Sequence, residues 1–442
     1  MSSVVIGLCR YTEKILSCLH KGSSLPGKLA LKYNSGMLRE LSSKYKVILV
    51  TGTNGKTTTA SLIAKILKDS GHTVIHNFSG ANMLSGVMTL FIKHEKDKSK
   101  EFAVVEIDEA SVPLYAEVAK AEYILCTNIF KDQLDRYGEM YTTFSKLRSG
   151  IKKIPGITIV SNGDEPLFGK IEGKTVYFGL EENPYYKVKE EKTNVEGQFC
   201  IRCGERYSYE FNTYNHLGKY MCKRCGYKRP LISYYVKDIS IKEGGSVRFK
   251  INDQVIIRSN LVEVYNIYNI LAAYAITNEI GIKSDIIVKS VESFEPRFGR
   301  SEVFEYSDKK INIILVKNPV GFNQGLRIPT FNNQSKCACF LLNDNGADGR
   351  DVSWIWDVDF ESNFIDCKKI FVGGKRKYDM ALRLKIAGYE SEKIEIFDNN
   401  KSLFEQIKSC SKCSYVYIYA TYTAMIELRR LLAEQKIIDH SW

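Results

Sequence analysis

The sequence predicts an α/β protein with two domains, each built on a mainly parallel sheet covered by helices, and a small metal-binding insert in the first. Three observations support this fold class. Strand-like and helix-like patterns alternate in two series along the chain, a glycine-rich turn follows the first strand pattern, and two C-x2-C pairs interrupt the first series.

The chain is large and moderately basic. Its 442 residues suffice for two or three domains, and 63 Lys and Arg against 51 Asp and Glu give a net charge of +12. This charge favours anionic partners, which include nucleotides, pyrophosphates, nucleic acid and acidic membrane surfaces. Charge alone does not choose among them.

Residues 1–45 predict a helical arm. Apolar residues recur there at nearly helical spacing, but Arg10, Glu13 and Lys14 interrupt any signal-like or membrane-spanning run. We expect the arm to pack on the next domain, with contact to a membrane surface as the alternative. Because the 12 cysteines occur without an export signal, we expect reduced or metal-bound thiols in a cytoplasmic protein, with a peripheral position at the inner membrane face as a variant.

The first strand-and-helix series predicts a central domain over residues 46–296, with the cysteine insert at about 198–230. The second series predicts a Rossmann-like C-terminal domain over residues 297–442. The strand-like runs of the first series are 46–52, 102–108, 123–130 and 157–162.

The turn "GTNGKT" at residues 52–57 is typical of a phosphate-binding loop. Backbone N–H groups of such a turn, with the partial positive charge of the following helix, bind phosphate oxygens. Lys56 is expected to neutralise the β- and γ-phosphates of ATP, and Thr57 to place its hydroxyl on the bridging Mg²⁺. Val50 stands where the general pattern has a further glycine, and a solvated turn is the alternative. The candidate nucleotide-binding residues are Gly52, Thr53, Asn54, Gly55, Lys56, Thr57 and Thr58.

Three carboxylates, Glu106, Asp108 and Glu109, end the strand-like run at 102–108. Carboxylate oxygens are ligands that Mg²⁺ prefers. Strand alternation places Glu106 and Asp108 on one face. Because a phosphate turn lies upstream, we expect Glu106 to bind Mg²⁺ together with Thr57. A solvated or structural role is the alternative for carboxylates in such a position.

The two C-x2-C pairs, separated by eighteen residues, predict a zinc ribbon. Four thiolates complete a tetrahedral Zn²⁺ without an open position, so the expected role is structural. The alternative is a nucleic-acid module of basic and aromatic residues. We expect the aromatic side chains to fill the ribbon's core instead, with no nucleic acid as partner, and we interpret His216 as an ordinary polar loop residue. The four expected ligands are Cys200, Cys203, Cys222 and Cys225.

Five segments together resemble the Mur ligase superfamily. They are "GTNGKTTT", "EIDEAS", "TNIFKDQLDRYGE", "NGDEP" and "YNIYNILAAYA". Members of that superfamily use ATP to convert a carboxylate into an acyl phosphate, which an amine then attacks. The resemblance implies a Mur ligase-like central domain and catalytic roles for Lys56 and Glu106.

The same resemblance implies further nucleotide contacts. Asn266 and Asn269 match positions beside the adenine, and Arg300 matches an arginine near the nucleotide phosphates, with a surface salt bridge as its alternative role. Two positions depart from the pattern. Gln133 stands where a second-magnesium histidine is usual, and Glu263 where a glycine is usual.

The segments "KNPVGFNQ" and "NDNGADGRDVSWIWD", with the ribbon, resemble one branch of the superfamily, the synthetase subunits of lipid II isoglutaminyl synthases. This resemblance implies ATP-dependent amidation of the D-glutamate α-carboxylate in the lipid II stem peptide. No cysteine lies in a G-x-C-x-G elbow, so ammonia is expected from a glutaminase partner. The resemblance implies a GatD-like amidotransferase subunit in a heterodimer.

It also assigns to Asp351 the acidic position of the partner's Cys–His site. The strand-like run "CACFLLND" supports this, because α/β domains present functional groups just past the carboxyl ends of strands. Alternatives are a solvated acidic turn and a calcium loop, and Gly346 and Ile355 contradict the latter because they occupy ligand positions.

Other functions stay open at this point. One is a ligase that adds an amino acid without a partner subunit, and another is a nucleic-acid binder. The pair Cys410 and Cys413 has no second pair near it in the sequence, so a second metal site or a redox motif is only a minor alternative, and the role of the pair is undetermined.

Overall fold

The computed structural model describes residues 7, 9–13, 24–77, 81–131, 140–182, 197–242, 246–261, 263–295, 300–331, 334–363 and 365–438. Gln133 and the side chain of Arg300 lie outside this part. The chain divides into two compact units, residues 1–130 with 139–294 and residues 131–138 with 295–442.

The first unit contains a nine-stranded sheet in the order β11-β10-β9-β6-β5-β4-β1-β3-β2. The seven strands from β2 to β9 in this order run parallel, whereas β10 and β11 continue the sheet antiparallel. The expected parallel sheet is therefore confirmed, with an antiparallel extension. The strands are β1 (Lys46–Thr51), β2 (Val74–His76), β3 (Phe102–Glu106), β4 (Tyr123–Cys126), β5 (Thr158–Asn162), β6 (Thr175–Leu180), β9 (Tyr234–Lys242), β10 (Ser246–Ile251) and β11 (Val255–Ser259).

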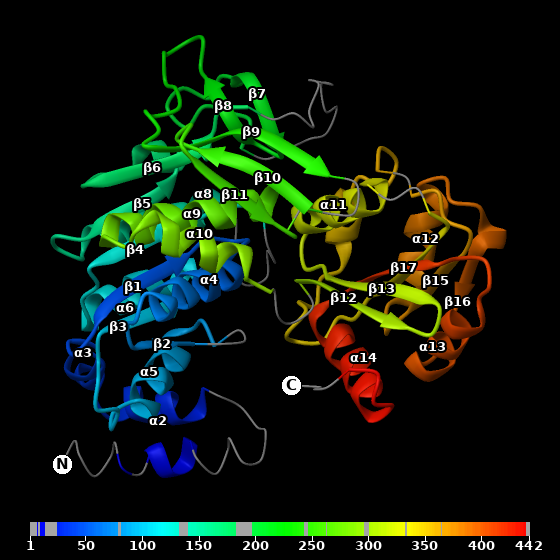
Figure 1. Cartoon of the computed structure of the whole chain (residues 1–442), viewed down its shortest axis with the longest axis horizontal. Coiled ribbons are helices and arrows are strands. Elements are labelled where there is room, and N and C mark those ends of the chain that lie inside the picture. The colour runs from blue at the N-terminus through cyan, green and yellow to red at the C-terminus, as the bar shows by residue number, and fades with distance from the viewer. Residues whose placement is uncertain are drawn as a thin grey trace. The chain divides into compact units, whose positions relative to one another are not determined.

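Helices form layers on both sides of this sheet (Figure 1). On one side, α4 (Lys56–Asp69), α9 (Val264–Ile280) and α10 (Ser284–Glu292) pack against one another. The other side carries α2 (Leu25–Tyr33), α3 (Gly36–Ser42), α5 (Leu84–Lys93), α6 (Val112–Val118) and α8 (Met140–Lys152).

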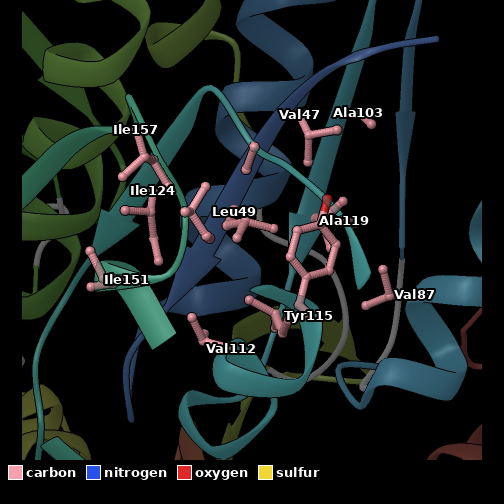
Figure 2. Packing of buried hydrophobic residues seen from close by; sticks show 14 of the residues in the cluster. Val47, Leu49, Val87, Ala103, Val112, Tyr115, Ala119, Ile124, Ile151 and Ile157 are labelled. Atoms are coloured by element: carbon pink, nitrogen blue, oxygen red, sulfur yellow. The ribbon is translucent and has the colours of Figure 1, made fainter. Parts of the chain in front are cut away.

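Alternate residues of β1 point to opposite faces of the sheet and therefore contribute to the cores on both sides. Val47 and Leu49 belong to the core beneath α6 and α8, and Figure 2 shows them gathered with Val112 and Tyr115 of α6. Ile48, between them, is fully buried and points to the opposite face. Each such side chain stabilises the fold by about 1.5–3 kcal/mol when buried.

The cysteine insert leaves the sheet after β6 and returns at β9, which pairs with β6 in parallel. Its hairpin consists of β7 (Ser208–Tyr214) and β8 (Leu217–Met221). Tyr207, Tyr220 and Tyr227 are buried together with Cys200 and Cys222, so aromatic side chains fill its core as expected.

The second unit is a six-stranded sheet in the order β12-β13-β17-β14-β15-β16, parallel except for the edge strand β12. Helices α11 and α12 contribute to the core on one face, and α13 and α14 to the core on the other. The elements are β12 (Arg300–Tyr306), β13 (Lys309–Leu315), α11 (Pro319–Arg327), β14 (Lys336–Leu341), β15 (Ile370–Gly373), α12 (Lys377–Ile386), β16 (Ile394–Ile396), α13 (Asn400–Ser409), β17 (Tyr415–Ala420) and α14 (Tyr422–Glu434).

No helix in the described part of the chain has the length and apolar character that crossing a bilayer requires.

The buried His76 at the end of β2 predicts a pH dependence of stability. Burial, with the Lys68 ammonium as a second cause, lowers the pKa of His76 from 6.5 to about 4. Between these values the unfolded chain binds a proton that the folded protein does not. We therefore expect the free energy of unfolding to fall as the pH drops from about 6.5 towards 4, by at most about 1.4 kcal/mol per pH unit from this residue.

Urea unfolding of the wild type and of His76→Gln at several pH values measures this contribution. The variant should show a flatter dependence over that range. His72→Gln is the matched control, because His72 lies four residues earlier with its side chain 36% exposed. Identical pH slopes for the wild type and His76→Gln would contradict the prediction.

Candidate functional site

The glycine turn connects β1 to α4 at the carboxyl edge of the parallel strands. Gly52 and Gly55 have φ angles of +124° and +87°, which side-chain-bearing residues rarely adopt. A Cβ atom on Gly52 would lie 2.2 Å from Thr127 Oγ1, and one on Gly55 would lie 2.2 Å from Asn269 Oδ1. Both glycines are therefore required, and they leave bare backbone at the start of the helix.

Thr53 and Asn54 fix the turn against the segment after β4. Thr53 N donates to Asn128 O at 2.9 Å, Asn54 N donates to Asn128 Oδ1 at 2.9 Å, and Phe130 N donates to Thr53 Oγ1 at 3.0 Å. The first i→i−4 bond of α4 runs from Thr59 N to Gly55 O at 3.0 Å. The N–H groups of residues 56–58 precede it at the helix start, a position where backbone N–H groups can bind an anion.

Lys56 is buried within this turn and is surrounded by oxygen atoms. Its Nζ donates to Gly52 O at 2.5 Å and lies 3.6 Å from both Asp108 Oδ1 and Glu109 Oε2. Thr53 Oγ1 donates to Glu109 Oε1 at 3.2 Å. Two of the three candidate carboxylates thus hold the lysine and the turn.

Glu106 has a different environment. Its backbone N donates to Asn77 Oδ1, and its carbonyl accepts from Asn77 Nδ2, both at 2.8 Å. Its carboxylate Oε2 is buried without a hydrogen-bond partner among the described residues. Such an oxygen is costly to bury unless a cation approaches it, so this position fits Mg²⁺. β3 ends at Glu106, so the strand alternation that placed Asp108 on the same face stops before Asp108.

Helix α9 brings two predicted residues to the turn. Thr59 Oγ1 donates to Asn269 Oδ1 at 3.3 Å, and Asn269 Nδ2 donates to Asn266 Oδ1 at 3.1 Å. Asn266 Nδ2 in turn donates to Glu263 Oε2 at 2.7 Å. Glu263, which replaces the usual glycine, precedes the first residue of α9 and orients Asn266 through this bond.

The insert gathers its four cysteines into one cluster. Their Sγ atoms all lie within 4.8 Å of one another, and Cys200–Cys225 and Cys203–Cys222 are each separated by 3.5 Å. Four sulfur atoms at about 2.3 Å from a tetrahedral Zn²⁺ would be about 3.8 Å apart, so the donor set fits this ion.

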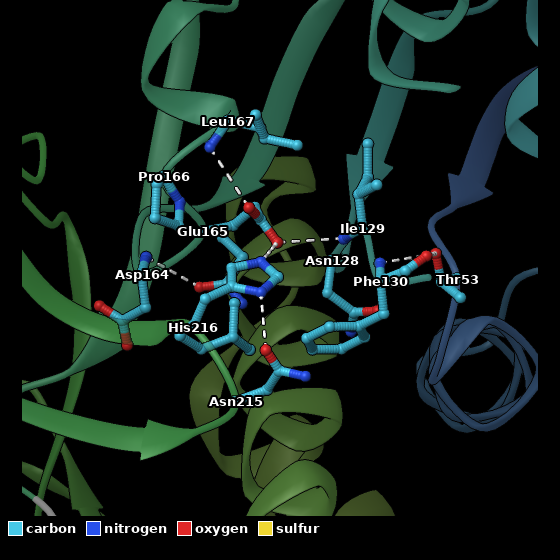
Figure 3. A network of polar contacts seen from close by, with 12 residues as sticks. Thr53, Asn128, Ile129, Phe130, Asp164, Glu165, Pro166, Leu167, Asn215 and His216 are labelled. Carbon is cyan, nitrogen blue, oxygen red and sulfur yellow. Dashed lines mark hydrogen bonds and ion pairs between the residues drawn. The ribbon is translucent and has the colours of Figure 1, made fainter. Parts of the chain in front are cut away.

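His216 is not the ordinary polar loop residue that we expected. It is 1% exposed, and its Nε2 lies 2.8 Å from Oε2 of the fully buried Glu165 (Figure 3). Ile129 N donates to the same Glu165 oxygen at 3.1 Å. The sequence interpretation failed because Glu165 is 51 residues away, in the "NGDEP" segment.

This pair connects the ribbon with the phosphate turn. Ile129 and Phe130 are adjacent, so residues 129–130 bind Glu165 on one side and Thr53 on the other, as Figure 3 shows. The sequence predicted a strand through residue 130, but β4 ends at Cys126 and the following residues make these bonds instead. Ribbon, "NGDEP" segment and turn therefore form one polar network.

Removal of His216 is expected to destabilise the first unit. His216→Ala leaves the buried Glu165 carboxylate without its imidazole partner, which should cost about 3 kcal/mol of unfolding free energy. Chemical denaturation measures the change. His94→Ala is the control, because His94 Nδ1 also lies 2.7 Å from a carboxylate, that of Asp97, but its side chain is 29% exposed. Equal losses in both variants would argue against the buried pair.

Asp348 and Asp351, two carboxylates of the acidic loop after β14, have different environments. Asp348 is buried and caps α14, since its Oδ1 accepts from Thr423 N at 2.7 Å. Asp351 is exposed, and its carboxylate accepts from Ser353 N at 2.8 Å and from Ser353 Oγ at 2.9 Å. These Ser353 bonds lower the pKa of Asp351, so the carboxylate is ionised at neutral pH. Asp348 was not predicted as a cap, because α14 starts 74 residues later in the sequence.

Comparison with known proteins places the chain in a family. Residues 50–223 match the Mur ligase middle domain, and residues 315–425 match the MurT ligase C-terminal domain. The MurT subunit of lipid II isoglutaminyl synthase (glutamine-hydrolyzing) from Streptococcus pneumoniae is 40% identical over 435 residues, which are 97% of this chain and 96% of that subunit. The chain belongs to the MurT family.

Solved structures show the same fold for this MurT-family chain. A pseudomurein peptide ligase type C from Methanothermus fervidus has a TM-score of 0.70 at 20% identity, covering 90% of this chain and 80% of the ligase. The MurF ligase from Thermotoga maritima in complex with ADP has a TM-score of 0.65 at 15% identity, covering 92% and 84%. The predicted Mur ligase-like fold is thereby confirmed.

Proposed function

We propose that this chain is the synthetase subunit that amidates the D-glutamate α-carboxylate of the lipid II stem peptide to D-isoglutamine, using ATP and ammonia. The observation that carries the proposal is a buried lysine in the glycine turn after β1, together with a Glu106 oxygen at the end of the neighbouring strand β3 that has no hydrogen-bond partner among the described residues, in a chain of the MurT family. The name of the Streptococcus pneumoniae relative, a lipid II isoglutaminyl synthase subunit, supports this substrate and reaction.

Different residues of the turn have different proposed roles in binding ATP. The backbone N–H groups at the helix start, residues 56–58, donate to the phosphate oxygens, and Lys56 neutralises charge that develops on the β- and γ-phosphates. Glu106 and the Thr57 hydroxyl would hold Mg²⁺, which would supply further neutralisation of phosphate charge. Thr53 and Asn54 keep the turn in shape through residues 128–130.

Other residues are proposed to make the remaining contacts with ATP. Asn266 and Asn269 are the proposed neighbours of the adenine, and Arg300, at the first position of β12, is a proposed phosphate ligand. The ADP complex of the MurF ligase supports a nucleotide site in this fold. In this division, residues 46–296 carry the ATP chemistry except for Arg300, which belongs to the C-terminal domain of residues 297–442.

The reaction proceeds in two displacements. A glutamyl carboxylate oxygen attacks the γ-phosphorus, ADP leaves, and an acyl phosphate forms. The ammonia nitrogen then attacks the acyl carbon, inorganic phosphate leaves, and nitrogen gives up a proton to become the carboxamide. The protein contributes by positioning the reactants and by stabilising negative charge.

Ammonia is proposed to come from a glutaminase subunit of the GatD type. The name of the relative, a subunit of a glutamine-hydrolyzing enzyme, supports a partner. Asp351 is the proposed acidic residue that orients the partner's catalytic histidine, because it is exposed and ionised on a loop that Asp348 anchors. We place this heterodimer in the cytoplasm, at the membrane face that presents lipid II.

The ribbon is proposed to bind a structural Zn²⁺ through Cys200, Cys203, Cys222 and Cys225. The ion would maintain the small core of the insert, whose hairpin carries His216 between β7 and β8 and so brings it to Glu165.

Incubation of the purified chain with lipid II, ATP and ammonium chloride tests the function. Mass spectrometry of the stem peptide should detect conversion of one carboxyl group to a carboxamide, with stoichiometric release of ADP. Addition of an amino acid to the peptide would support a stand-alone ligase instead. Salt-dependent oligonucleotide binding without amidation would support the nucleic-acid alternative.

A further inference from the structure

The second unit contains a cysteine cluster that the ligase chemistry does not use. Cys337, Cys410 and Cys413 each have a Sγ atom within 4.8 Å of the other two. Cys337 and Cys410 are 73 residues apart in the sequence, but their sulfur atoms are 4.0 Å apart. The pair at 410–413 thus gains a third member that sequence spacing does not reveal.

The fold explains why these residues meet. Cys337 is the second residue of β14, and it lies beside Val416 of the neighbouring parallel strand β17. Cys410 follows the last residue of α13, and Cys413 lies two residues before β17. All three are therefore at the amino ends of the parallel strands, at the edge opposite to the acidic loop that follows β14.

The geometry suits a metal ion held by three thiolates. Three sulfur atoms at about 2.3 Å from a metal in one plane would be about 4.0 Å apart, and those of a tetrahedral site about 3.8 Å. Cys337 and Cys413 are buried and Cys410 is partly exposed, so solvent has access on one side. All three are free thiols.

Two lysines interact electrostatically with the cluster, and each of them also pairs with a carboxylate. Lys309 is 3% exposed and interacts with Cys413, and its Nζ lies 2.9 Å from Asp308 Oδ1. Lys369 interacts with Cys410 and Cys337 and pairs with Glu395. The spacing of the three sulfur atoms, not the nearby charge, is therefore the observation that supports a metal site.

We propose that Cys337, Cys410 and Cys413 bind a second thiophilic metal ion, Zn²⁺ or Cu⁺, with the fourth position on the solvent side of Cys410. Thiolate donors select these ions over harder cations. The ion joins the turn between α13 and β17 to the start of β14. Its role is structural, because the site lies away from the strand edge that carries Asp351.

Metal analysis of the full-length chain tests the site. Protein from medium supplied with zinc or with copper is purified without chelator, and its zinc and copper are measured per chain. We expect two ions in the wild type and one in Cys410→Ser/Cys413→Ser. The control is Cys339→Ala in the same strand, which should keep two, because Cys339 is a buried cysteine outside the cluster. The metal that occupies the site identifies which ion it prefers.

Cobalt titration provides a second measurement, which can be made on a variant whose ribbon no longer binds metal. In the variant Cys200→Ser/Cys203→Ser, a thiolate-to-cobalt charge-transfer band should persist. The band should disappear when Cys410→Ser is added to this variant. Cys410→Ser is a mild change, because the residue is partly exposed. The proposal is overturned if wild-type protein binds one ion and Cys410→Ser/Cys413→Ser binds the same one. A disulfide between two of the three cysteines in freshly purified protein, detected by peptide mass spectrometry, also overturns it.

Discussion

Lys56→Ala is expected to reduce ATP-dependent amidation by at least about 100-fold, whether ammonia or glutamine supplies the nitrogen. The lysine is 7% exposed, and its ammonium lies 3.6 Å from two carboxylates at the end of the phosphate turn. Its removal takes away the cation that we propose faces the transferred phosphoryl group. It also leaves Asp108 and Glu109 close together without a counter-charge, which should repel the triphosphate.

Calorimetry with Mg-ATP and a coupled ADP assay measure the two consequences. Lys65→Ala is the matched control, since Lys65 lies in the same helix but pairs with Asp69 at a site where its side chain is 30% exposed. Circular dichroism of both variants checks that the fold is retained. Wild-type heats of nucleotide binding in a folded Lys56→Ala protein would contradict the proposed site.

Asp351→Asn is expected to lower glutamine-dependent amidation by about 10²- to 10⁴-fold while leaving ammonia-dependent amidation near the wild-type value. The range follows from the effect of replacing the acidic member of a catalytic triad. An asparagine keeps the size of the side chain and can still accept hydrogen bonds from Ser353, but it lacks the negative charge that would orient and stabilise a partner's imidazolium.

The two activities are measured side by side, with the glutaminase subunit and glutamine, or with ammonium chloride alone. Asp344→Asn, in the same loop, is the control, because Asp344 Oδ2 lies 3.4 Å from Arg376 Nη1 and has no proposed part in catalysis. Equal loss of both activities in Asp351→Asn would show that the residue supports the synthetase itself. Asp348→Asn should weaken the cap of α14 and therefore lower stability.

Much of the fold could be predicted, because its elements have local signals. The patterns at 46–60 and 415–434 place a strand directly before a helix, and β1, α4, β17 and α14 follow them closely. β4 was predicted too long, since hydrophobic and β-branched residues continue to Phe130 although the strand pairing stops at Cys126. The antiparallel strands β10 and β11 continue the parallel sheet, an arrangement that no local pattern distinguishes.

Those parts of the candidate site whose residues lie close together in the sequence were predictable. Gly52, Gly55 and Lys56 have a recognisable spacing, and so do the four cysteines of the ribbon. The partners of Lys56 were not predictable in the same way. Asp108 and Glu109 were candidates for Mg²⁺, whereas their contacts with the lysine depend on where β3 ends.

Local sequence was enough to specify a glycine-rich turn between a strand and a helix, a four-cysteine knuckle pair and alternating strands and helices, because each depends on residues that are close in the sequence. Tertiary structure decided which buried groups share a charge or a hydrogen bond. His216 meets Glu165, Asp348 meets the start of α14, and Cys337 meets Cys410. These contacts join residues more than 50 positions apart, and chain folding, not spacing, brings such atoms within bonding distance.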